Sequence, residues 1–265
     1  MSTDILLVEK KDRVATLTFN RPEKRNSLSQ DLLIKIHQTL DNFAREDEIR
    51  AVVVRGVGDK AFSSGYDIAA IPTEVSPQTR EKLRDQNPLE LALNSIVNFP
   101  YPVIALLNGY AFGAGCELAV CCDLRIGADD IRMGMPPAKL GLVYQLSGLM
   151  RFIQVVGISN TREIFLTGRY YPAPRAKEMG LVDYLLPRQE VEAFAYEMAR
   201  EIAGNAPLSV KGTKRILNLL SKTITLSDED RREANRIIAQ AFSSEDLKEA
   251  QKAFLEKRKP EFKRR

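Results

Sequence analysis

Two short turns built from small residues, far apart in the chain, constrain most strongly what this sequence can fold into. The first spans residues 62–67 (FSSGYD) and the second spans 109–117 (GYAFGAGCE). Each follows an apolar stretch that predicts a buried strand, and the second opens into a predicted helix. Backbone N–H groups at such turns and at helix N-termini are unpaired donors that suit an anion. Two of them converging on one carbonyl oxygen would form an oxyanion hole, which predicts acyl chemistry.

The remaining sequence alternates between strand and helix patterns. Strands are predicted over 5–9, 14–19, 51–55, 103–107, 124–128 and 182–186, and helices from about Ser29 and over 88–98 and 113–121. Residues 72–86 are polar and aperiodic, which predicts a loop or an irregular helical insert. From Gln189 onward the pattern is helical, near 189–203, 207–221, 227–242 and 245–257. The fold class expected is therefore α/β, with a C-terminal α-helical extension.

Composition narrows the classes of protein that fit. A chain of 265 residues with 44% hydrophobic residues fits one large domain, or one domain with an appended helical part. No apolar run approaches the roughly 20 residues that a membrane span needs, and the first residues lack the order of a signal peptide. The cysteines, Cys116, Cys121 and Cys122, share one short segment and cannot make a disulfide framework. We therefore expect a reduced, cytoplasmic protein.

A basic cluster lies at the end of a chain whose net charge is only +4. It consists of Lys257, Arg258, Lys259, Lys263, Arg264 and Arg265. These charges fit either a solvated tail or a surface that faces a phosphate-rich small ligand or nucleic acid.

Several common sites do not fit the sequence. The segment from Gly113 begins like a dinucleotide fingerprint, but Leu118 stands where the third glycine is required. The cysteines form no C-x-x-C pair, so buried thiols are expected rather than a metal site. His37 is the single histidine and lies on an amphipathic helix, which makes a Ser-His-Asp or Cys-His triad improbable. Acid–base chemistry must then fall to carboxylates, tyrosines or lysines.

Five segments, in order along the chain, resemble the crotonase (enoyl-CoA hydratase/isomerase) superfamily. They are RPEKRNSLS at 21–29, FSSGYDI at 62–68, NGYAFGAGCELAVCCDLRIGAD at 108–129, LTGRYYPAPRAKEMGLVDYLLP at 166–187 and AFLEKRKPEF at 253–262. The resemblance implies a ββα spiral catalytic core, here 1–188, and a helical region, here 189–265, for oligomerisation and CoA contacts. It also implies an acyl-CoA substrate and a homotrimer or a hexamer of two trimers. No cofactor beyond the CoA moiety is implied, and no nucleic acid or membrane partner.

The same resemblance assigns binding residues. It places the two oxyanion amides at Tyr66 and at Ala114, which stands where glycine is usual. Contacts to CoA or substrate are implied for Arg25, Leu28, Ser64, Ile68, Gly113, Pro137, Leu142, Phe254 and Lys257. Phe254 and Lys257 resemble residues that reach the CoA of a neighbouring subunit.

The acid–base residues depart from the usual pattern of the superfamily. Its hydratases carry one glutamate in G-x-G-C-E and a second in F-G-x-P-E. Here Glu117 fills the first place, whereas residues 133–137 read MGMPP, so that Pro137 replaces the second. Hydration needs one group to activate water and one to protonate the α-carbon. A lone carboxylate can do both only with less driving force, so an efficient standard hydratase is not expected.

Four segments together resemble the methylmalonyl-CoA decarboxylases of the superfamily, where a tyrosine that matches Tyr144 lies beside the departing carboxylate. They are FSSGYDIAAIP at 62–72, NPLELALNSIVNFPYPVIALLNG at 87–109, LGLVYQLSGL at 140–149 and SEDLKEAQKAFLEKRKPEF at 244–262. Decarboxylation of a malonyl-type thioester leaves an enolate, which the oxyanion hole stabilises. Tyr144 would orient the carboxylate by one hydrogen bond, and Leu142 and Val143 would supply apolar walls. This chain departs from those enzymes at Tyr66, where they carry histidine, and at Pro136, where they carry threonine.

Other interpretations stay open at this point. The chain could be an enoyl-CoA hydratase/isomerase for an unusual enoyl-CoA, with Glu117 as its single acid/base. Glu117 could equally be a hydrogen-bonded structural carboxylate, and Tyr144 an aromatic filler of the pocket wall. A non-catalytic protein that binds RNA or a protein partner rests only on the C-terminal charge, without a basic–aromatic recognition motif.

Overall fold

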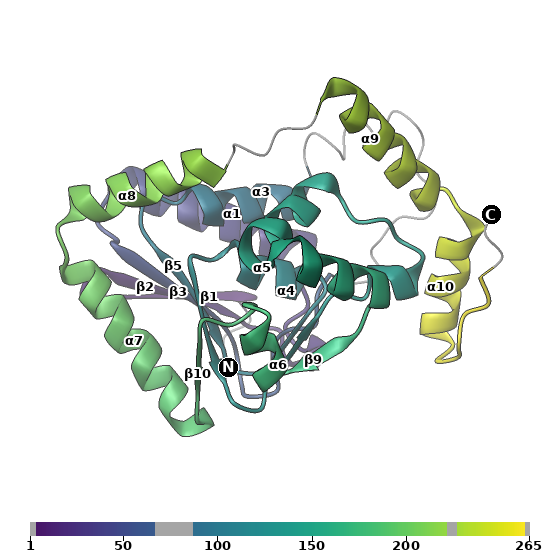
Figure 1. Cartoon of the computed structure of the whole chain (residues 1–265). Helices are drawn as coiled ribbons and strands as arrows, with labels where there is room; N and C mark the ends of the chain where they lie inside the picture. The colour runs from purple at the N-terminus through teal and green to yellow at the C-terminus, as the bar shows by residue number, and fades with distance from the viewer. Residues whose placement is uncertain (1–3, 67–86, 222–226, 263–265) are drawn as a thin grey trace.

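Two β-sheets form the centre of the computed structural model, which describes residues 4–66, 87–221 and 227–262 (Figure 1). The larger sheet has the strand order β1-β2-β3-β5-β7-β10. These strands are β1 (Leu6–Lys11), β2 (Val14–Phe19), β3 (Ala51–Gly56), β5 (Val103–Leu107), β7 (Leu124–Ala128) and β10 (Tyr184–Leu186). The β1–β2 hairpin is antiparallel, and every other pair is parallel. The six strands predicted from the sequence are these six.

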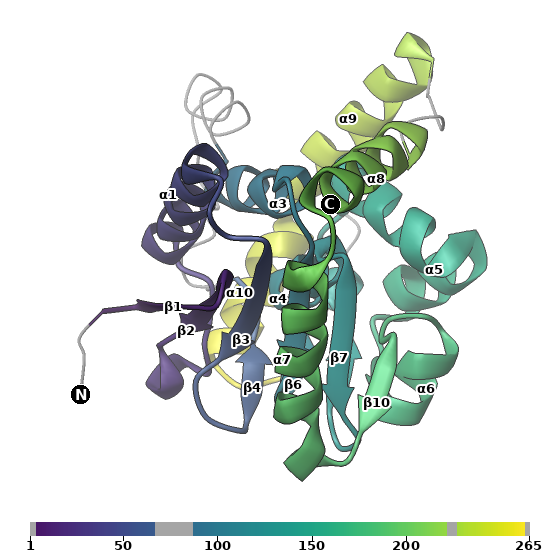
Figure 2. The ribbon, with the colours of Figure 1, turned by 90° about the vertical axis from the view of Figure 1, so that its left-hand side faces the viewer.

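Helices cover the larger sheet, so its central strands are buried almost throughout. The helix α1 (Gln30–Glu46) packs with α3 (Pro88–Asn98), while α7 (Arg188–Gly204) runs along β3, β5 and β7 (Figure 2). In α1 the Ser29 side chain caps the first turn by accepting a hydrogen bond from the Leu32 amide at 3.3 Å. The buried face of α1 holds Leu32, Leu33, Ile36, Leu40 and Phe43, the 3.6-residue pattern predicted for it.

The smaller sheet, with strand order β4-β6-β8-β9, is not predicted by the sequence pattern. Its strands are β4 (Ala61–Ser63), β6 (Tyr110–Phe112), β8 (Arg132–Gly134) and β9 (Tyr170–Pro172). Each has three residues, which is too short for an alternating pattern to be recognised. The first three strands are parallel, so their carboxyl ends meet at one edge. Both small-residue turns leave the sheet at that edge.

Two helices continue from this edge. The short helix α4 (Ala114–Cys121) follows β6 and is buried at all eight residues. After the single-turn helix η3 (Pro137–Leu140) comes α5 (Leu146–Thr167), which the sequence pattern does not predict. Gly157, with φ 75° and ψ 164°, interrupts α5 and divides its apolar period into two short pieces. The helix α6 (Ala173–Glu178) then leads to β10.

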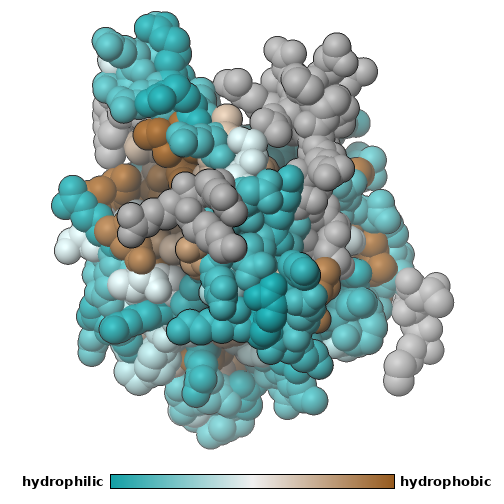
Figure 3. Space-filling view, turned by 90° about the vertical axis from the view of Figure 1, so that its right-hand side faces the viewer, coloured by the Kyte–Doolittle hydropathy of each residue, from teal (hydrophilic) through white to brown (hydrophobic). Residues whose placement is uncertain are grey.

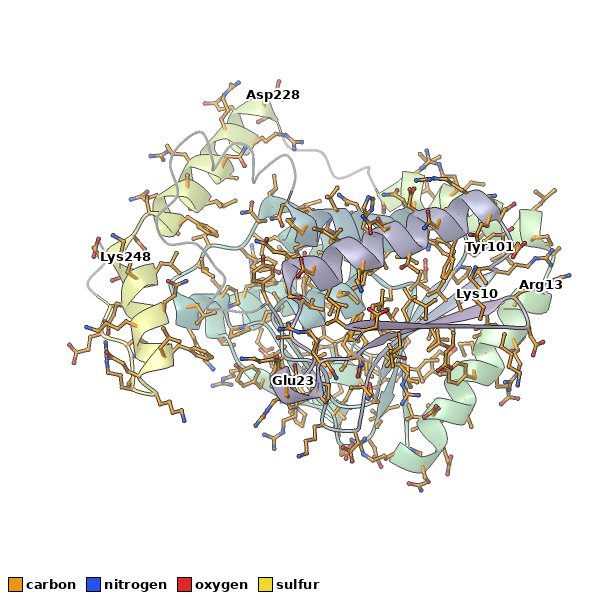
Figure 4. All side chains as sticks on the ribbon, turned by 180° about the vertical axis from the view of Figure 1, so that it is seen from behind. Lys10, Arg13, Glu23, Tyr101, Asp228 and Lys248 are labelled. Carbon is orange, nitrogen blue, oxygen red and sulfur yellow. The ribbon has the colours of Figure 1, made fainter. Side chains whose placement is uncertain are left out.

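The C-terminal region is helical, as predicted. After α7 it comprises α8 (Pro207–Leu220), α9 (Asp228–Phe242) and α10 (Glu245–Leu255). Buried Lys214 of α8 donates to the Asp123 carboxylate at 2.6 Å and to the Tyr101 carbonyl at 3.0 Å, which holds α8 on the core. Seen from behind, Asp228 of α9 and Lys248 of α10 lie at the side of the molecule opposite Arg13 in the β1–β2 turn (Figure 4). The use of 189–265 for oligomerisation stays a prediction.

Figure 3 shows brown, apolar areas among hydrophilic side chains on the face that carries α9 and α10. Exposed apolar side chains of this region include Phe254, which is 56% exposed, and Leu255. None of the helices described here combines the length and apolar character needed to cross a membrane. The loop or helical insert expected over 72–86 lies outside the described residues.

Candidate active site

The two small-residue turns lie directly against each other. Parallel pairing of β4 with β6 sets Ser63 opposite Ala111, which brings the turns that follow side by side. The approach is close at Gly65, where φ is 98°: a Cβ atom there would lie 2.7 Å from the Phe112 carbonyl oxygen and 3.4 Å from the Ala114 nitrogen. Only glycine fits. The peptide N–H groups of Tyr66 and Ala114 therefore belong to neighbouring turns.

Ala114 is the first residue of α4, so its N–H has no acceptor within the helix and lies at the positive end of the helix dipole. The preceding Gly113 adopts φ 52° and ψ −127°, and its own N–H donates to the Gly134 carbonyl at 2.9 Å. That bond ties the turn to β8. The arrangement supplies the kind of backbone donors that a developing oxyanion requires.

Glu117 lies one helical turn beyond Ala114 and is only 1% exposed. Its Oε1 accepts a hydrogen bond from Arg151 Nη1 at 2.9 Å, and its Oε2 accepts one from the Tyr144 hydroxyl. Burial raises the pKa of Glu117, while Arg151 and Tyr144 both act to lower it. Both carboxylate oxygens are thus engaged by side chains of the protein.

Arg151 and Glu90, which the sequence analysis missed, extend this cluster. Arg151 Nη2 donates to Glu90 Oε2 at 2.8 Å and to Asn94 Oδ1 at 3.1 Å. The Ser147 hydroxyl donates to Glu90 Oε1 at 2.9 Å. The available signal was an arginine within the largely apolar segment at 146–156 (LSGLMRFIQVV), but without a predicted helix there it could not be placed on a face.

Tyr144 packs over Gly148 of α5. A Cβ atom at Gly148 would lie 2.4 Å from Tyr144 Cε1 and 2.8 Å from Glu117 Oε1, so a side chain here would displace both groups. Burial, with the neighbouring Glu117 charge, raises the pKa of Tyr144 well above its ordinary value. Its hydroxyl was expected to face a substrate carboxylate. In this structure the hydroxyl donates to Glu117, a contact that the sequence did not indicate.

Three of the expected CoA contacts lie beside the Tyr66 turn. The Ser64 amide donates to the Arg25 carbonyl at 3.0 Å, and the Leu28 amide donates to the Gly65 carbonyl at 2.8 Å. Arg25 is exposed and its guanidinium donates to the Tyr110 hydroxyl at 3.0 Å. The Leu28 side chain is fully buried in the core, which leaves only its backbone at the turn. Ile68 lies outside the described residues.

The remaining expected contacts come from η3, the segment after it and α10. Pro137 is buried, and Leu142 is half-buried. Gly141 lies against the start of α10 of the same chain, since a Cβ atom there would be 3.1 Å from the Asp246 carbonyl. Phe254 therefore belongs to a helix that packs on this chain's own η3, and Lys257 lies in the turn just beyond the end of that helix. Their contact with CoA of a neighbouring subunit stays a prediction.

The cysteines and histidine contribute no group of catalytic character. The three thiols are buried, and burial raises the pKa of Cys116 to about 12. His37 Nδ1 lies 2.6 Å from the Ser95 hydroxyl, between α1 and α3. Among the described residues there is no cluster of three or more side chains that could hold a metal ion.

Comparison with known proteins agrees with this geometry. The sequence profile of the family described as enoyl-CoA hydratase/isomerase matches residues 9–265. A probable mitochondrial enoyl-CoA hydratase of Dictyostelium discoideum is 34% identical over 95% of this chain and 88% of its own length. Methylmalonyl-CoA decarboxylase of Escherichia coli K12 is 31% identical over 95% of each chain.

A solved structure of methylmalonyl-CoA decarboxylase in complex with 2-nitronate-propionyl-CoA is also similar to this chain. It has a TM-score of 0.92 at 30% identity, and the match covers 100% of both chains. The profile and these relatives span nearly the whole sequence. This chain therefore belongs to the enoyl-CoA hydratase/isomerase family and is an acyl-CoA enzyme of the crotonase superfamily.

Proposed function

We propose that this enzyme decarboxylates a malonyl-type acyl-CoA, such as methylmalonyl-CoA. The observation that carries the proposal is the state of Glu117, whose two oxygens are held by Arg151 and by Tyr144. A hydratase needs a carboxylate oxygen free to take a proton from water. Here each oxygen of Glu117 already accepts a hydrogen bond from a side chain of the protein, and the residue is only 1% exposed, which disfavours its use as a base toward water.

The segment after β8 supports the same conclusion. Pro137 stands where the resemblance places the second glutamate of a hydratase, and it is buried at the start of η3. Proline cannot accept or donate a proton. A neutral residue here also avoids repulsion between the enzyme and a carboxylate carried by the substrate.

The site contains most of the groups that decarboxylation requires. When the bond between the α-carbon and the carboxylate breaks, carbon dioxide leaves and the bonding electrons form a thioester enolate. The amides of Tyr66 and Ala114 stabilise the enolate oxygen, and the α-carbon then takes a proton from water to give the saturated acyl-CoA. Tyr144 orients the carboxylate by donating a hydrogen bond. The similarity to methylmalonyl-CoA decarboxylase adds support.

One observation favours a second candidate, an enoyl-CoA hydratase. Burial raises the pKa of Glu117, and a carboxyl group with a raised pKa can serve as a general acid. Relatives named as hydratases also match the chain. In this alternative Glu117 acts alone, as both acid and base.

A mass-spectrometric screen of the purified protein separates the two candidates. Malonyl-, methylmalonyl- and ethylmalonyl-CoA would be tested beside short enoyl-CoAs, because loss of carbon dioxide and addition of water change the mass differently. We expect turnover of at least one malonyl-type thioester and little hydration. Efficient hydration with no loss of carbon dioxide from any malonyl-type thioester would overturn the proposal.

A further inference from the structure

The Tyr144 hydroxyl has one proton, and in this structure it uses that proton to donate a hydrogen bond to Glu117. A substrate carboxylate beside Tyr144 would need the same proton. If Tyr144 turned toward the substrate, Glu117 Oε2 would lose its donor while buried. The phenol oxygen would then stand between two carboxylates with one proton to share.

We propose that Glu117 takes up one proton from solvent when an α-carboxylated acyl-CoA binds, and that the hydrogen bond between Glu117 and Tyr144 thereby reverses. Protonated Glu117 then donates to the Tyr144 oxygen, and Tyr144 donates to the substrate carboxylate. In this arrangement the Tyr144 oxygen, the Glu117 hydroxyl and the substrate carboxylate each take part in a hydrogen bond. The inference rests on the proposed function, since it requires a substrate that carries a carboxylate.

The charges around Glu117 favour this outcome. From α3 comes Glu90, from α5 comes Arg151, and the segment between η3 and α5 supplies Tyr144. The thiols of Cys116 and Cys121, on the same helix as Glu117, are neutral because burial raises their pKa. Arg151 therefore balances one of two carboxylates, and a substrate carboxylate would add a further negative charge.

Of the two carboxylates that contact Arg151, Glu117 is the one expected to take the proton. Its side chain is 2% exposed, whereas that of Glu90 is 26% exposed and accepts bonds from both Arg151 and Ser147. Desolvation and a nearby like charge both favour the neutral form of a carboxyl group. Burial already raises the pKa of Glu117 in the free protein.

Arg151 is then a positioning residue with a defined electrostatic task. It opposes the protonation of Glu117 in the free enzyme and holds the carboxylate in place while Tyr144 changes its acceptor. Without Arg151, Glu117 would lose the one cation that contacts it among the described residues, which would favour the neutral form of Glu117 before any ligand arrives.

Calorimetric titration in buffers of different ionisation enthalpy measures this proton directly. The probe is 2-carboxypropyl-CoA, which carries a carboxylate but no thioester carbonyl and so cannot form the enolate. Propionyl-CoA, without the carboxylate, is the matched control and shares the CoA phosphates. Near neutral pH, we expect binding of the carboxylated probe to be accompanied by uptake of up to one proton, and binding of propionyl-CoA by none. Binding of the carboxylated probe should weaken with rising pH, and its Kd should increase by about tenfold per pH unit above the pKa of free Glu117.

Three variants and one control variant test the assignment. Glu117→Gln should bind the probe without proton uptake, since the amide can donate to Tyr144 at any pH. Arg151→Gln should also lose the uptake near neutral pH, and Arg151→Lys should restore it. Arg175→Gln, which removes a partly exposed arginine that pairs with Glu163 and Glu178, should behave as the parent protein.

Equal proton counts for the two ligands across the pH range would overturn the inference, as would unchanged uptake in Glu117→Gln. Neither result touches the proposed function if the parent enzyme still releases carbon dioxide from a malonyl-type thioester. Conversely, a protein that releases none fails the proposed function, whatever its proton count.

Discussion

Two regions of the molecule are built from different parts of the chain. They are the edge of the smaller sheet that carries the proposed oxyanion amides, called here the edge, and the group of side chains around Glu117, called here the cluster. The edge uses backbone amides at Tyr66 and Ala114, fixed by parallel strands β4 and β6. The cluster uses side chains of Glu117, Tyr144, Arg151 and others, which come from α3, α4, α5 and the segment after η3. A backbone N–H remains when the side chain of its residue is replaced by any side chain other than proline. In the cluster, by contrast, each substitution changes the chemical groups that are present.

This difference explains where the family and the particular reaction are encoded. Ala114 in place of the usual glycine still supplies an N–H, so enolate stabilisation is compatible with several side chains. Pro137 supplies no carboxylate where the family's hydratases carry their second glutamate, and Tyr144 and Arg151 each donate to one oxygen of Glu117. We therefore expect the edge to support acyl-CoA chemistry in general, and the cluster to decide which reaction follows.

The largest effect is expected from removing a backbone donor. Ala114→Pro deletes one N–H at the first residue of α4, a position where proline is compatible with a helix. By analogy with other single-donor losses, kcat should fall by roughly a hundredfold or more on any accepted acyl-CoA. Stopped-flow or steady-state kinetics would measure the fall in kcat, and a thermal melt of the same preparation would show whether the variant is folded.

The matched control is Ala114→Ser, which keeps the N–H and should retain most activity. If Ala114→Pro folds, binds CoA and turns over near the parent rate, Ala114 is not an oxyanion donor and the comparison between the two regions fails.

A smaller and selective effect is expected from the cluster. Tyr144→Phe removes the hydroxyl but keeps the aromatic volume. Loss of one charge-assisted hydrogen bond should cost about 1.5–3 kcal/mol in kcat/KM, or roughly tenfold to a hundredfold, for malonyl-type thioesters. An enoyl-CoA should lose little, because it has no carboxylate at that position.

Tyr196→Phe serves as a control, since the Tyr196 hydroxyl contacts Thr16 away from the site. Equal, small losses of Tyr144→Phe on both substrate classes would make Tyr144 a filler of the pocket wall. The decarboxylase proposal would then rest on Glu117 and on resemblance.

The smallest effect on decarboxylation is expected from Glu117→Gln. Loss of carbon dioxide needs no base before the enolate forms, and glutamine can accept from Arg151 while donating to Tyr144. The rate should stay within about tenfold of the parent, whereas any hydratase activity should fall severely. Assays of both reactions on one folded preparation, with exposed Glu192→Gln as the control, decide between them. Abolished decarboxylation in a folded protein would contradict the mechanism.

Local sequence was enough to predict the strands of the larger sheet, several of the helices and the two small-residue turns, whose amides remain the predicted oxyanion donors. Strands such as β3 and β5 are continuous apolar runs, and α1 combines a Ser29 cap with a regular buried face. The three-residue strands of the smaller sheet and the interrupted helix α5 were not predictable. In them pairing with distant residues, rather than their own periodicity, fixes the conformation.

The sequence by itself therefore determined that two small-residue turns follow buried strands, that Pro137 stands in place of the family's second glutamate, and that Tyr144 follows it in the same segment. Only the tertiary structure decided that Arg151 and Glu90 surround Glu117 and that the Tyr144 hydroxyl points to it. The reason is physical. A turn and a helix start are set by neighbouring residues, but a buried ion cluster depends on how α3, α4 and α5 pack, and no local pattern records that.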